Sequence, residues 1–183
     1  MKSLYANRGR SAELVVEITL RSYAEQGIAL IQKIPTPWVV TRRGGTVAGA
    51  FPAKKSTVDY IGVWNGKAVA FDAKEVGEPR FPLSRIPEHQ LQFLERFAKM
   101  GGVAGVLAWF YVQHEFWWLP AGLLLEAEAQ GARSLSLARI RERAIPVPQG
   151  PGVPLDIVSV WMRLAEGGSV WKTTMQPVLA ANG

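Results

Sequence analysis

The stretch Ser56-Thr-Val-Asp-Tyr-Ile-Gly-Val-Trp-Asn-Gly-Lys-Ala-Val-Ala-Phe-Asp-Ala-Lys-Glu75 decides the fold of this chain. It holds two runs of apolar, β-branched and aromatic residues, one on each side of an Asn-Gly pair. Asn-Gly is the strongest short-range signal for a tight hairpin, because both central residues of a type I′ turn need a positive φ. The stretch therefore predicts two antiparallel strands joined at Asn65 and Gly66.

A two-residue turn also determines which residues face each other across the hairpin. Counting outward from Trp64 opposite Lys67 places Asp59 opposite Asp72. This is a non-hydrogen-bonded pair, whose Cβ atoms lie roughly 4.5–5.5 Å apart. Side chains alternate faces along a strand, so Lys74 lies on the same face as Asp72. We therefore expect two carboxylates and an ammonium group in one small cluster.

A divalent cation is the natural partner of two carboxylates held this close, because like charges repel unless a positive charge separates them. Oxygen ligands completed by water suit Mg²⁺, or alternatively Mn²⁺, better than zinc, and the chain has no cysteine. In the alternative interpretation Asp59 and Asp72 are ordinary solvated strand residues that Lys74 neutralises. Ile61 and Ala70 share their face, which puts the carboxylates at the edge of a buried surface and favours the metal site.

The spacing of these residues resembles the PD-(D/E)-x-K nuclease motif, and the surrounding sequence is similar to RecU, the Holliday-junction resolvase of Gram-positive bacteria and their phages. The resemblance covers about residues 7 to 120 and rests on six blocks in matching order. These blocks are Asn7-Arg8-Gly9 with Glu13, Lys33-Ile-Pro-Thr-Pro, Ser56-Thr-Val-Asp-Tyr, Phe71-Asp-Ala-Lys-Glu, Phe81-Pro-Leu and His89-Gln90. The chain differs in carrying Asp72 where Glu is common, and its last third matches poorly.

The resemblance implies a fold, an activity and a set of site residues. The fold would be α/β, a restriction-endonuclease-like core with a central mixed β-sheet flanked by helices. The activity would be that of a metal-dependent endodeoxyribonuclease that works as a homodimer on four-way DNA junctions, with recombination proteins as further partners. The implied catalytic residues are Asp59, Asp72, Lys74 and Gln90, and the implied metal ligands are Asp59, Asp72 and Glu13.

Two other functions remain open alongside junction cleavage. One is another nuclease of the same superfamily, a nickase or a restriction-like enzyme. The other is a protein that binds branched DNA without cutting it and regulates recombination. The facing carboxylates and the lysine favour an enzyme, since a protein that only binds DNA has no need of them.

Residues 42–55 predict a basic stalk. Four cations bracket a glycine-rich tip in this segment, and the resemblance to RecU implies a protrusion here that enters the centre of a four-way junction. Cations at the tip would contact phosphates, and Phe51 would stack on an exposed base. The alternative is a disordered surface loop. The residues expected to contact DNA are Arg8, Arg42, Arg43, Lys54, Lys55, Thr57 and His89.

Charge and composition agree with a DNA-binding protein of one domain. Lys and Arg number 21 against 15 Asp and Glu, giving a net charge of +6 and a pI near 9.8, which favours a polyanionic partner. A chain of 183 residues with 48% hydrophobic content is enough for one sizeable core. The start of the chain lacks the apolar core of a signal peptide, so a cytoplasmic location is expected.

Periodicity predicts the remaining elements. A first helix over residues 11–26 would bury Leu14, Val15, Ile18 and Ser22. Further helices are expected at 87–100, 120–130 and 156–164, and further strands at 28–34, 38–41, 103–112 and 115–119.

Three further features concern the last third and the tryptophans. Residues 133–143 carry four arginines between apolar residues, which would face either phosphates or solvent. The proline-rich residues 145–155 predict an arm outside the core. The seven tryptophans of the chain predict a hydrophobic surface for a dimer interface.

Overall fold

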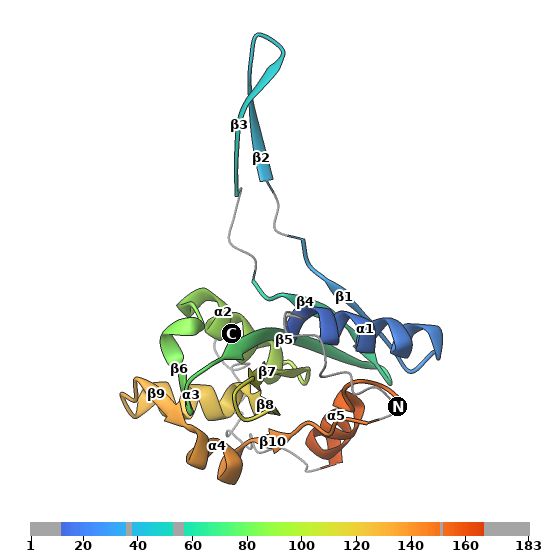
Figure 1. The fold of residues 1–183 in the computed structure, drawn as a ribbon, viewed down its shortest axis with the longest axis vertical. Coiled ribbons are helices and arrows are strands. Elements are labelled where there is room, and N and C mark those ends of the chain that lie inside the picture. The colour runs from blue at the N-terminus through green and yellow to red at the C-terminus, as the bar shows by residue number, and fades with distance from the viewer. Residues whose placement is uncertain (1–11, 36–37, 53–56, 151, 167–183) are drawn as a thin grey trace, which may run out of the picture.

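A mixed six-stranded sheet forms the centre of the molecule (Figure 1). The computed structural model describes residues 12–35, 38–52, 57–150 and 152–166. Within these residues the strand order is β1-β4-β5-β7-β8-β10. The strands are β1 (Ala29–Lys33), β4 (Tyr60–Trp64), β5 (Lys67–Val76), β7 (Val103–Phe110), β8 (Glu115–Pro120) and β10 (Ile145–Pro146). Only the β5–β7 pair is parallel, which confirms the predicted mixed sheet.

The predicted hairpin is present with the predicted register. Asn65 and Gly66 have φ values of 45° and 72°, as a type I′ turn requires. Trp64 faces Lys67, and the ladder continues in step until Tyr60 faces Phe71. The Asn-Gly turn therefore controls how β4 and β5 pair along their whole common length.

Helices cover both faces of the sheet. The apolar residues of α1 (Ala12–Glu25) and α5 (Ile157–Glu166) pack on one face. Those of α2 (Glu88–Lys99), α3 (Ala121–Ala129) and α4 (Leu137–Arg143) pack on the other. Because β7 is covered on both sides, its residues are nearly all buried, which explains the continuous apolar run in its sequence. The expected restriction-endonuclease-like α/β arrangement is thus confirmed.

The first helix is confirmed, but its buried face is shifted from the predicted one: Val15 packs against the core and Ile18 and Ser22 are half-buried, and Leu14 is exposed. Leu14 is 39% exposed, while the residues buried on α1 are Ala12, Val16, Thr19, Leu20 and Tyr23. The two polar side chains can be buried because their hydroxyl groups have partners. The Thr19 hydroxyl donates to the Val15 carbonyl at 2.9 Å, and the Tyr23 hydroxyl donates to the Leu155 carbonyl at 2.7 Å.

Most of the tryptophans whose side chains the structure describes are buried in the core. Trp118 and Trp161 are fully buried, and Trp64 is 6% exposed. The ring of Trp161 lies 5.8 Å from that of Trp64 and 6.2 Å from that of Trp118, between the sheet and α5. The prediction of a tryptophan-rich surface is therefore wrong for these residues, since α5 supplies the face that covers them.

The proline-rich segment packs on the body and does not extend as an arm. Ile145 and Pro146 pair with β8 as strand β10. The Val147 N–H donates to the Phe116 carbonyl at 2.9 Å, and Leu155 is fully buried. Proline tolerates this place because β10 is an edge strand, where one side of the backbone needs no ladder partner.

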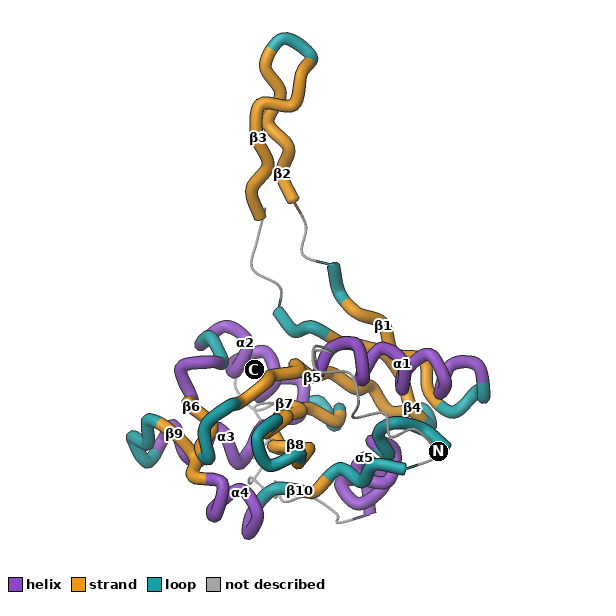
Figure 2. Tube along the Cα trace, viewed as in Figure 1, coloured by secondary structure: helices purple, strands orange, loops and turns teal. Residues whose placement is uncertain are grey.

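A separate hairpin stands away from the body, as Figures 1 and 2 show. It consists of β2 (Trp38–Arg43) and β3 (Thr46–Pro52), which pair only with each other. Gly44 and Gly45 turn the chain at its tip with φ values of 59° and 83°. The predicted stalk is thus present as a regular antiparallel ladder that begins before residue 42, and the alternative of a disordered loop is wrong for these residues.

The remaining described elements complete the side of the body next to α2. Strands β6 (Arg80–Pro82) and β9 (Ser134–Ser136) form a small antiparallel sheet, followed after β6 by the 3₁₀ helix η2 (Leu83–Arg85). In the described part of the chain, no helix has the length and apolar character needed to cross a membrane.

The close contact between β1 and β4 predicts a strong effect of Gly62→Ala. A Cβ atom at this position would lie 2.0 Å from the Leu30 carbonyl oxygen and 2.6 Å from the Ile31 Cα. Because backbone atoms cannot move aside, we expect a loss of about 1–3 kcal/mol in the free energy of unfolding, measured by denaturant titration. Gly152→Ala, which has open space around its Cβ, should change it by less than about 0.5 kcal/mol. Equal losses in both variants would contradict this explanation.

Candidate functional site

Asp59, Asp72 and Lys74 meet as predicted, where Asp59 directly precedes β4 and Asp72 and Lys74 lie in the second half of β5. The Asp59 N–H donates to Asp72 Oδ1 at 2.7 Å, and the Ala73 N–H donates to Asp59 Oδ2 at 3.4 Å. Lys74 Nζ lies 3.0 Å from Asp72 Oδ2 and 3.7 Å from Asp59 Oδ2. One ammonium group is therefore shared by two neighbouring carboxylates and offsets one of their two negative charges.

The pairing around Asp59 is less regular than predicted. The β4–β5 ladder ends at Tyr60 opposite Phe71, and the chain bends at Asp59. The bend lets the Asp59 N–H reach the side chain of Asp72. The Asp59 carbonyl meanwhile accepts from the Ile34 N–H at 2.8 Å, which ties the bend to the end of β1.

The environment of the two carboxylates suits a cation. Asp72 is fully buried, and its Oδ2 accepts no hydrogen bond from the described residues apart from its ion pair with Lys74. A buried oxygen with unused lone pairs is costly unless a cation or a donor occupies them. Burial raises the pKa of the Asp59 carboxyl, the charge of Asp72 raises it further, and Lys74 opposes both. A divalent cation would reduce the repulsion between the two carboxylates and would give the buried Asp72 Oδ2 a further partner.

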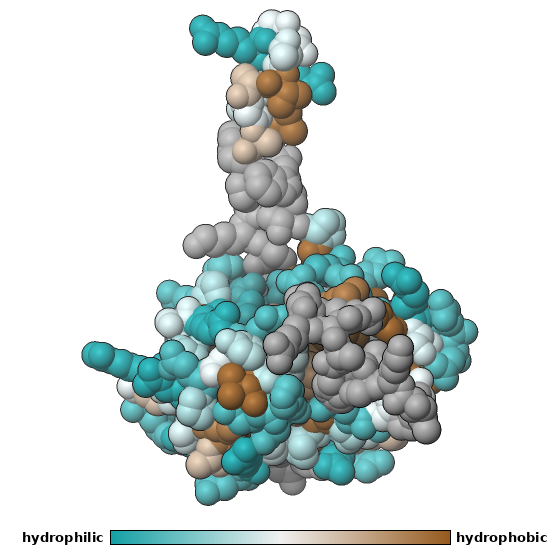
Figure 3. All heavy atoms as spheres, viewed as in Figure 1, coloured by the Kyte–Doolittle hydropathy of each residue, from teal (hydrophilic) through white to brown (hydrophobic). Residues whose placement is uncertain are grey.

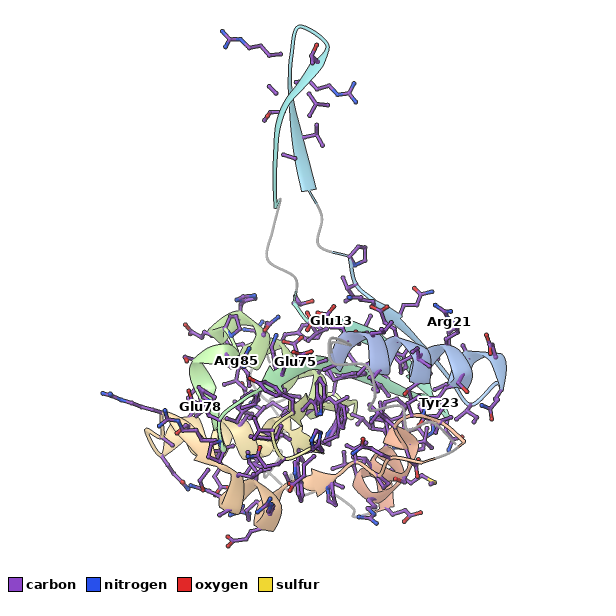
Figure 4. The ribbon with its side chains drawn as sticks, in the orientation of Figure 1. Glu13, Arg21, Tyr23, Glu75, Glu78 and Arg85 are labelled. Atoms are coloured by element: carbon purple, nitrogen blue, oxygen red, sulfur yellow. The ribbon has the colours of Figure 1, made fainter. Side chains whose placement is uncertain are left out.

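Asp59 and Lys74 line a hollow of ≈ 510 Å³, and Asp72 lies buried behind them. Its lining consists of Ala12, Glu13, Asp59, Ala73, Lys74, Glu75 and Arg85. Figure 4 shows Glu13, Glu75 and Arg85 in the part of the body nearest to the stalk. The lining residues therefore place the hollow in this part of the body.

Glu13 lines this hollow but is engaged elsewhere. Its carboxylate pairs with Lys33 Nζ at 2.7 Å, and Lys33 also pairs with Glu17 at 2.8 Å. These two carboxylates raise the pKa of Lys33 above its ordinary value. Among the described residues, no three His, Asp or Glu side chains gather into a group ready to hold a metal. The role of Glu13 as a metal ligand stays a prediction.

The other predicted site residues lie in three places. Gln90 is 6% exposed in the first turn of α2, and its Oε1 has no hydrogen-bond partner among the described residues. Thr57 is exposed and His89 is half-buried. Arg42 and Arg43 are exposed at the tip of the stalk, whose surface in Figure 3 mixes hydrophilic and hydrophobic side chains. Arg8, Lys54 and Lys55 lie outside the described residues.

Three of the four arginines in residues 133–143 are paired with carboxylates and do not form a free basic face. Arg139 and Arg143 pair with Glu126 at 3.5 Å and 2.8 Å, and Arg141 pairs with Glu115. This pairing lowers the pKa of Glu115 below its ordinary value. These arginines therefore link α4 to α3 and β8.

Glu75 and Arg85 are site residues that the sequence did not indicate. The Glu75 carboxylate accepts a hydrogen bond from the N–H of Ala12, at the start of α1. An Nη1 donor of Arg85 reaches the carbonyl oxygen of Glu75. Glu75 ends one of the six matching blocks, but alternation puts it on the opposite face from Lys74, and Arg85 lies in a polar turn region, so neither was predicted as a site residue.

Two carboxylates and a lysine carried by neighbouring strands of a mixed, helix-covered sheet are typical of the PD-(D/E)-x-K class of metal-dependent nucleases. Comparison with known proteins is more specific. The model of the RecU family, described as "Recombination protein U", matches residues 7–163, and the chain belongs to this family.

Three curated relatives show the extent of the similarity, and each is a Holliday junction resolvase RecU. That of Streptococcus pneumoniae (strain Taiwan19F-14) is 35% identical over 161 residues, covering 82% of this chain and 81% of the relative. That of Geobacillus kaustophilus is 32% identical, covering 85% and 84%. That of Geobacillus thermodenitrificans is 33% identical, covering 87% and 85%. The match thus continues well beyond residue 120.

The raised pKa of Asp59 predicts a pH dependence of stability in the metal-free protein. The folded protein holds the Asp59 proton more tightly than the unfolded chain does. The protonated Asp59 carboxyl therefore stabilises the folded protein fully at a pH below the ordinary aspartate pKa. This stabilisation is lost as the pH rises through the raised pKa of Asp59. The measurement is the free energy of unfolding as a function of pH, with a chelator present to remove metal ions. In Asp59→Asn this free energy should no longer fall over that pH range.

Glu78→Gln is the matched control, because Glu78 is an exposed carboxylate that pairs with Arg80 at 2.6 Å outside the hollow. This variant should keep the pH dependence of the parent protein. If Asp59→Asn showed the same pH dependence of stability as the parent protein, Asp59 would not be the cause of the stability loss.

Proposed function

We propose that this protein is a metal-dependent endodeoxyribonuclease that resolves four-way DNA junctions during recombination and repair. Its family and the names of its relatives support junction cleavage. The observation that carries the chemistry is the contact of Asp59, Asp72 and Lys74 at the edge of an open hollow. The carboxylates supply oxygen ligands and the lysine supplies a fixed positive charge.

Asp59 and Asp72 would hold Mg²⁺, or alternatively Mn²⁺, with Glu13 as a further candidate ligand. Their oxygen-only chemistry and the unused lone pairs of Asp72 Oδ2 fit such an ion. When bound, the ion lowers the pKa of a water molecule and screens the phosphate. Lys74 would stabilise the negative charge that develops during attack, and Gln90 would orient water or phosphate.

The stalk would supply the preference for branched DNA. Arg42 and Arg43 lie exposed at its tip, where they can reach phosphates that the body does not contact. A paired hairpin keeps its length better than a flexible loop, which suits insertion into the open centre of a junction. Thr57, His89 and the residues outside the described ranges, Arg8, Lys54 and Lys55, stay predicted DNA contacts.

A homodimer would place two such sites on one junction. A four-way junction is resolved by two opposed cuts, and a two-fold pair of identical subunits matches that symmetry. The mass in solution, measured by sedimentation equilibrium with and without junction DNA, tests this proposal. A single-chain mass in both conditions would contradict it. Recombination proteins are further candidate partners.

A nickase or restriction-like nuclease and a non-cleaving regulator are the competing functions. A panel of four-way junction, flap and linear duplex separates them, because each candidate predicts a different pattern of cuts in Mg²⁺. Preferred cutting of linear duplex would favour the restriction-like enzyme. Binding of the junction without any cut in Mg²⁺ or Mn²⁺ would favour the regulator.

Asp59→Asn and Asp72→Asn should each abolish junction cleavage while leaving binding measurable. The substitutions keep the shape of the side chain and remove the charge that holds the ion, so we expect at least about a 100-fold loss of cleavage rate. Cleavage of a labelled synthetic junction in Mg²⁺ checks this. Glu78→Gln, outside the hollow, should cut at the parent rate.

The same variants test the metal site without relying on activity. Mg²⁺ at 100 times its dissociation constant should stabilise the parent protein by about 2.7 kcal/mol in thermal unfolding. The two Asn variants should lose most of this stabilisation. If Mg²⁺ raised the melting temperature of all three proteins equally, the carboxylate pair would not be its site.

Arg42→Gln combined with Arg43→Gln should weaken the preference of the protein for a junction over duplex. Each phosphate contact that is lost should reduce the slope of log binding constant against log salt by roughly 0.9. Arg21→Gln, a substitution of an exposed arginine on α1, serves as the control. An unchanged preference in the double variant would remove the stalk tip from junction recognition.

A further inference from the structure

Arg85 places a second cation in the wall of the nuclease hollow. It is the last residue of η2, and its side chain lines the same hollow as Asp59 and Lys74. Its side chain is exposed, so a bound polyanion can reach it. Figure 4 shows it beside Glu75, next to the start of α1.

The guanidinium group of Arg85 has free hydrogen-bonding capacity. It carries five N–H donors, and one of its nitrogens contacts the carbonyl oxygen of Glu75. It forms no salt bridge with a carboxylate of the described residues, whereas Arg80 pairs with Glu78 and Arg141 pairs with Glu115. A guanidinium with unused donors in a hollow is well suited to bind a phosphate, often through two parallel hydrogen bonds.

The backbone that carries Arg85 is firmly anchored. The Ile86 N–H donates to the Leu83 carbonyl at 3.0 Å, and the Leu83 N–H donates to the Arg133 carbonyl at 3.0 Å. Ile86 is 6% exposed within the core cluster beneath α2. The contact with Glu75 then fixes the side chain, so little conformational freedom is lost when an anion binds.

We propose that Arg85 binds the phosphate next to the scissile phosphate on the cleaved strand. This inference rests on the proposed nuclease function. Lys74 already provides a cation at the carboxylate pair, where the bond would be cut. The hollow of ≈ 510 Å³ is as large as sites for whole small molecules and so has room for more than one phosphate. Arg85 thereby positions the strand relative to the carboxylates.

The salt dependence of binding tests the phosphate contact directly. Binding of a four-way junction and of a linear duplex would be measured in chelator, where no cleavage occurs, for Arg85→Gln, Arg85→Lys and Arg80→Gln. For Arg85→Gln we expect roughly tenfold weaker binding and a salt slope smaller by about 0.9. Arg85→Lys keeps the charge and should restore the slope. Arg80→Gln should match the parent protein.

Neutral methylphosphonates identify which phosphate is contacted. Replacing the phosphate next to the cut should weaken binding by the parent protein and cause no further loss in Arg85→Gln. In Mg²⁺, Arg85→Gln should raise KM more than it lowers kcat. A parent-like salt slope in Arg85→Gln, or equal sensitivity of both proteins to every methylphosphonate, would overturn the inference.

These results are separable from a failure of the proposed function. If the parent protein cut no junction, the function would fail, while the salt slope on duplex DNA would still report on Arg85. If the parent protein cut junctions and Arg85→Gln had the salt slope and KM of the parent, the nuclease function would be supported. The proposed contact of Arg85 with a phosphate would then be wrong. A melting temperature close to that of the parent excludes unfolding as the cause.

Discussion

The repulsion between Asp59 and Asp72 is the constraint on which the rest of the site depends. Lys74 is the one cation within 4 Å of both carboxylates among the described residues, so the cluster retains one net negative charge. A divalent ion would convert this into one net positive charge, which matches a single phosphodiester. At an effective dielectric constant near 20, unit charges 4 Å apart interact by about 4 kcal/mol, so this balance has a large effect on binding.

The fold keeps these charges together by holding the strands that carry them. Asp72 lies in β5, which has β4 on one side and β7 on the other, so its backbone has little freedom to move. Asp59 is tied to β1 through the Ile34 N–H. The stalk is inserted between β1 and Asp59 in the sequence. The element proposed to recognise the junction is therefore continuous with the residues that would cut it.

Local signals in the sequence were sufficient for the centre of the fold. The Asn65-Gly66 turn determines the β4–β5 register, and through it the meeting of Asp59, Asp72 and Lys74. The long apolar run of β7 indicated a strand buried on both faces. These predictions hold because turn chemistry and side-chain alternation act over a few residues and need no knowledge of distant packing.

Features that depend on distant partners could not be predicted in the same way. Thr19 and Tyr23 carry hydroxyl groups, and the hydrogen bonds of these groups explain why α1 can bury both side chains. The proline-rich segment packs inward because β8 offers it an edge, and Trp161 is buried because α5 returns to the sheet. Arg85 is held in the site by its hydrogen bond to the carbonyl oxygen of Glu75, and the spacing of residues in the sequence does not predict this contact.

The hydrogen bonds of the Tyr23 hydroxyl group affect how the protein folds during its synthesis. It donates to the Leu155 carbonyl and accepts from the Ile157 N–H, 132 and 134 residues further along the chain. On the ribosome, α1 therefore lacks these partners until Leu155 and Ile157 have emerged. Such long-range closure is slow and leaves apolar surface exposed in the meantime. A nascent chain, or one truncated before residue 155, would therefore lack the Tyr23 anchor of the helix that lines the hollow through Ala12 and Glu13.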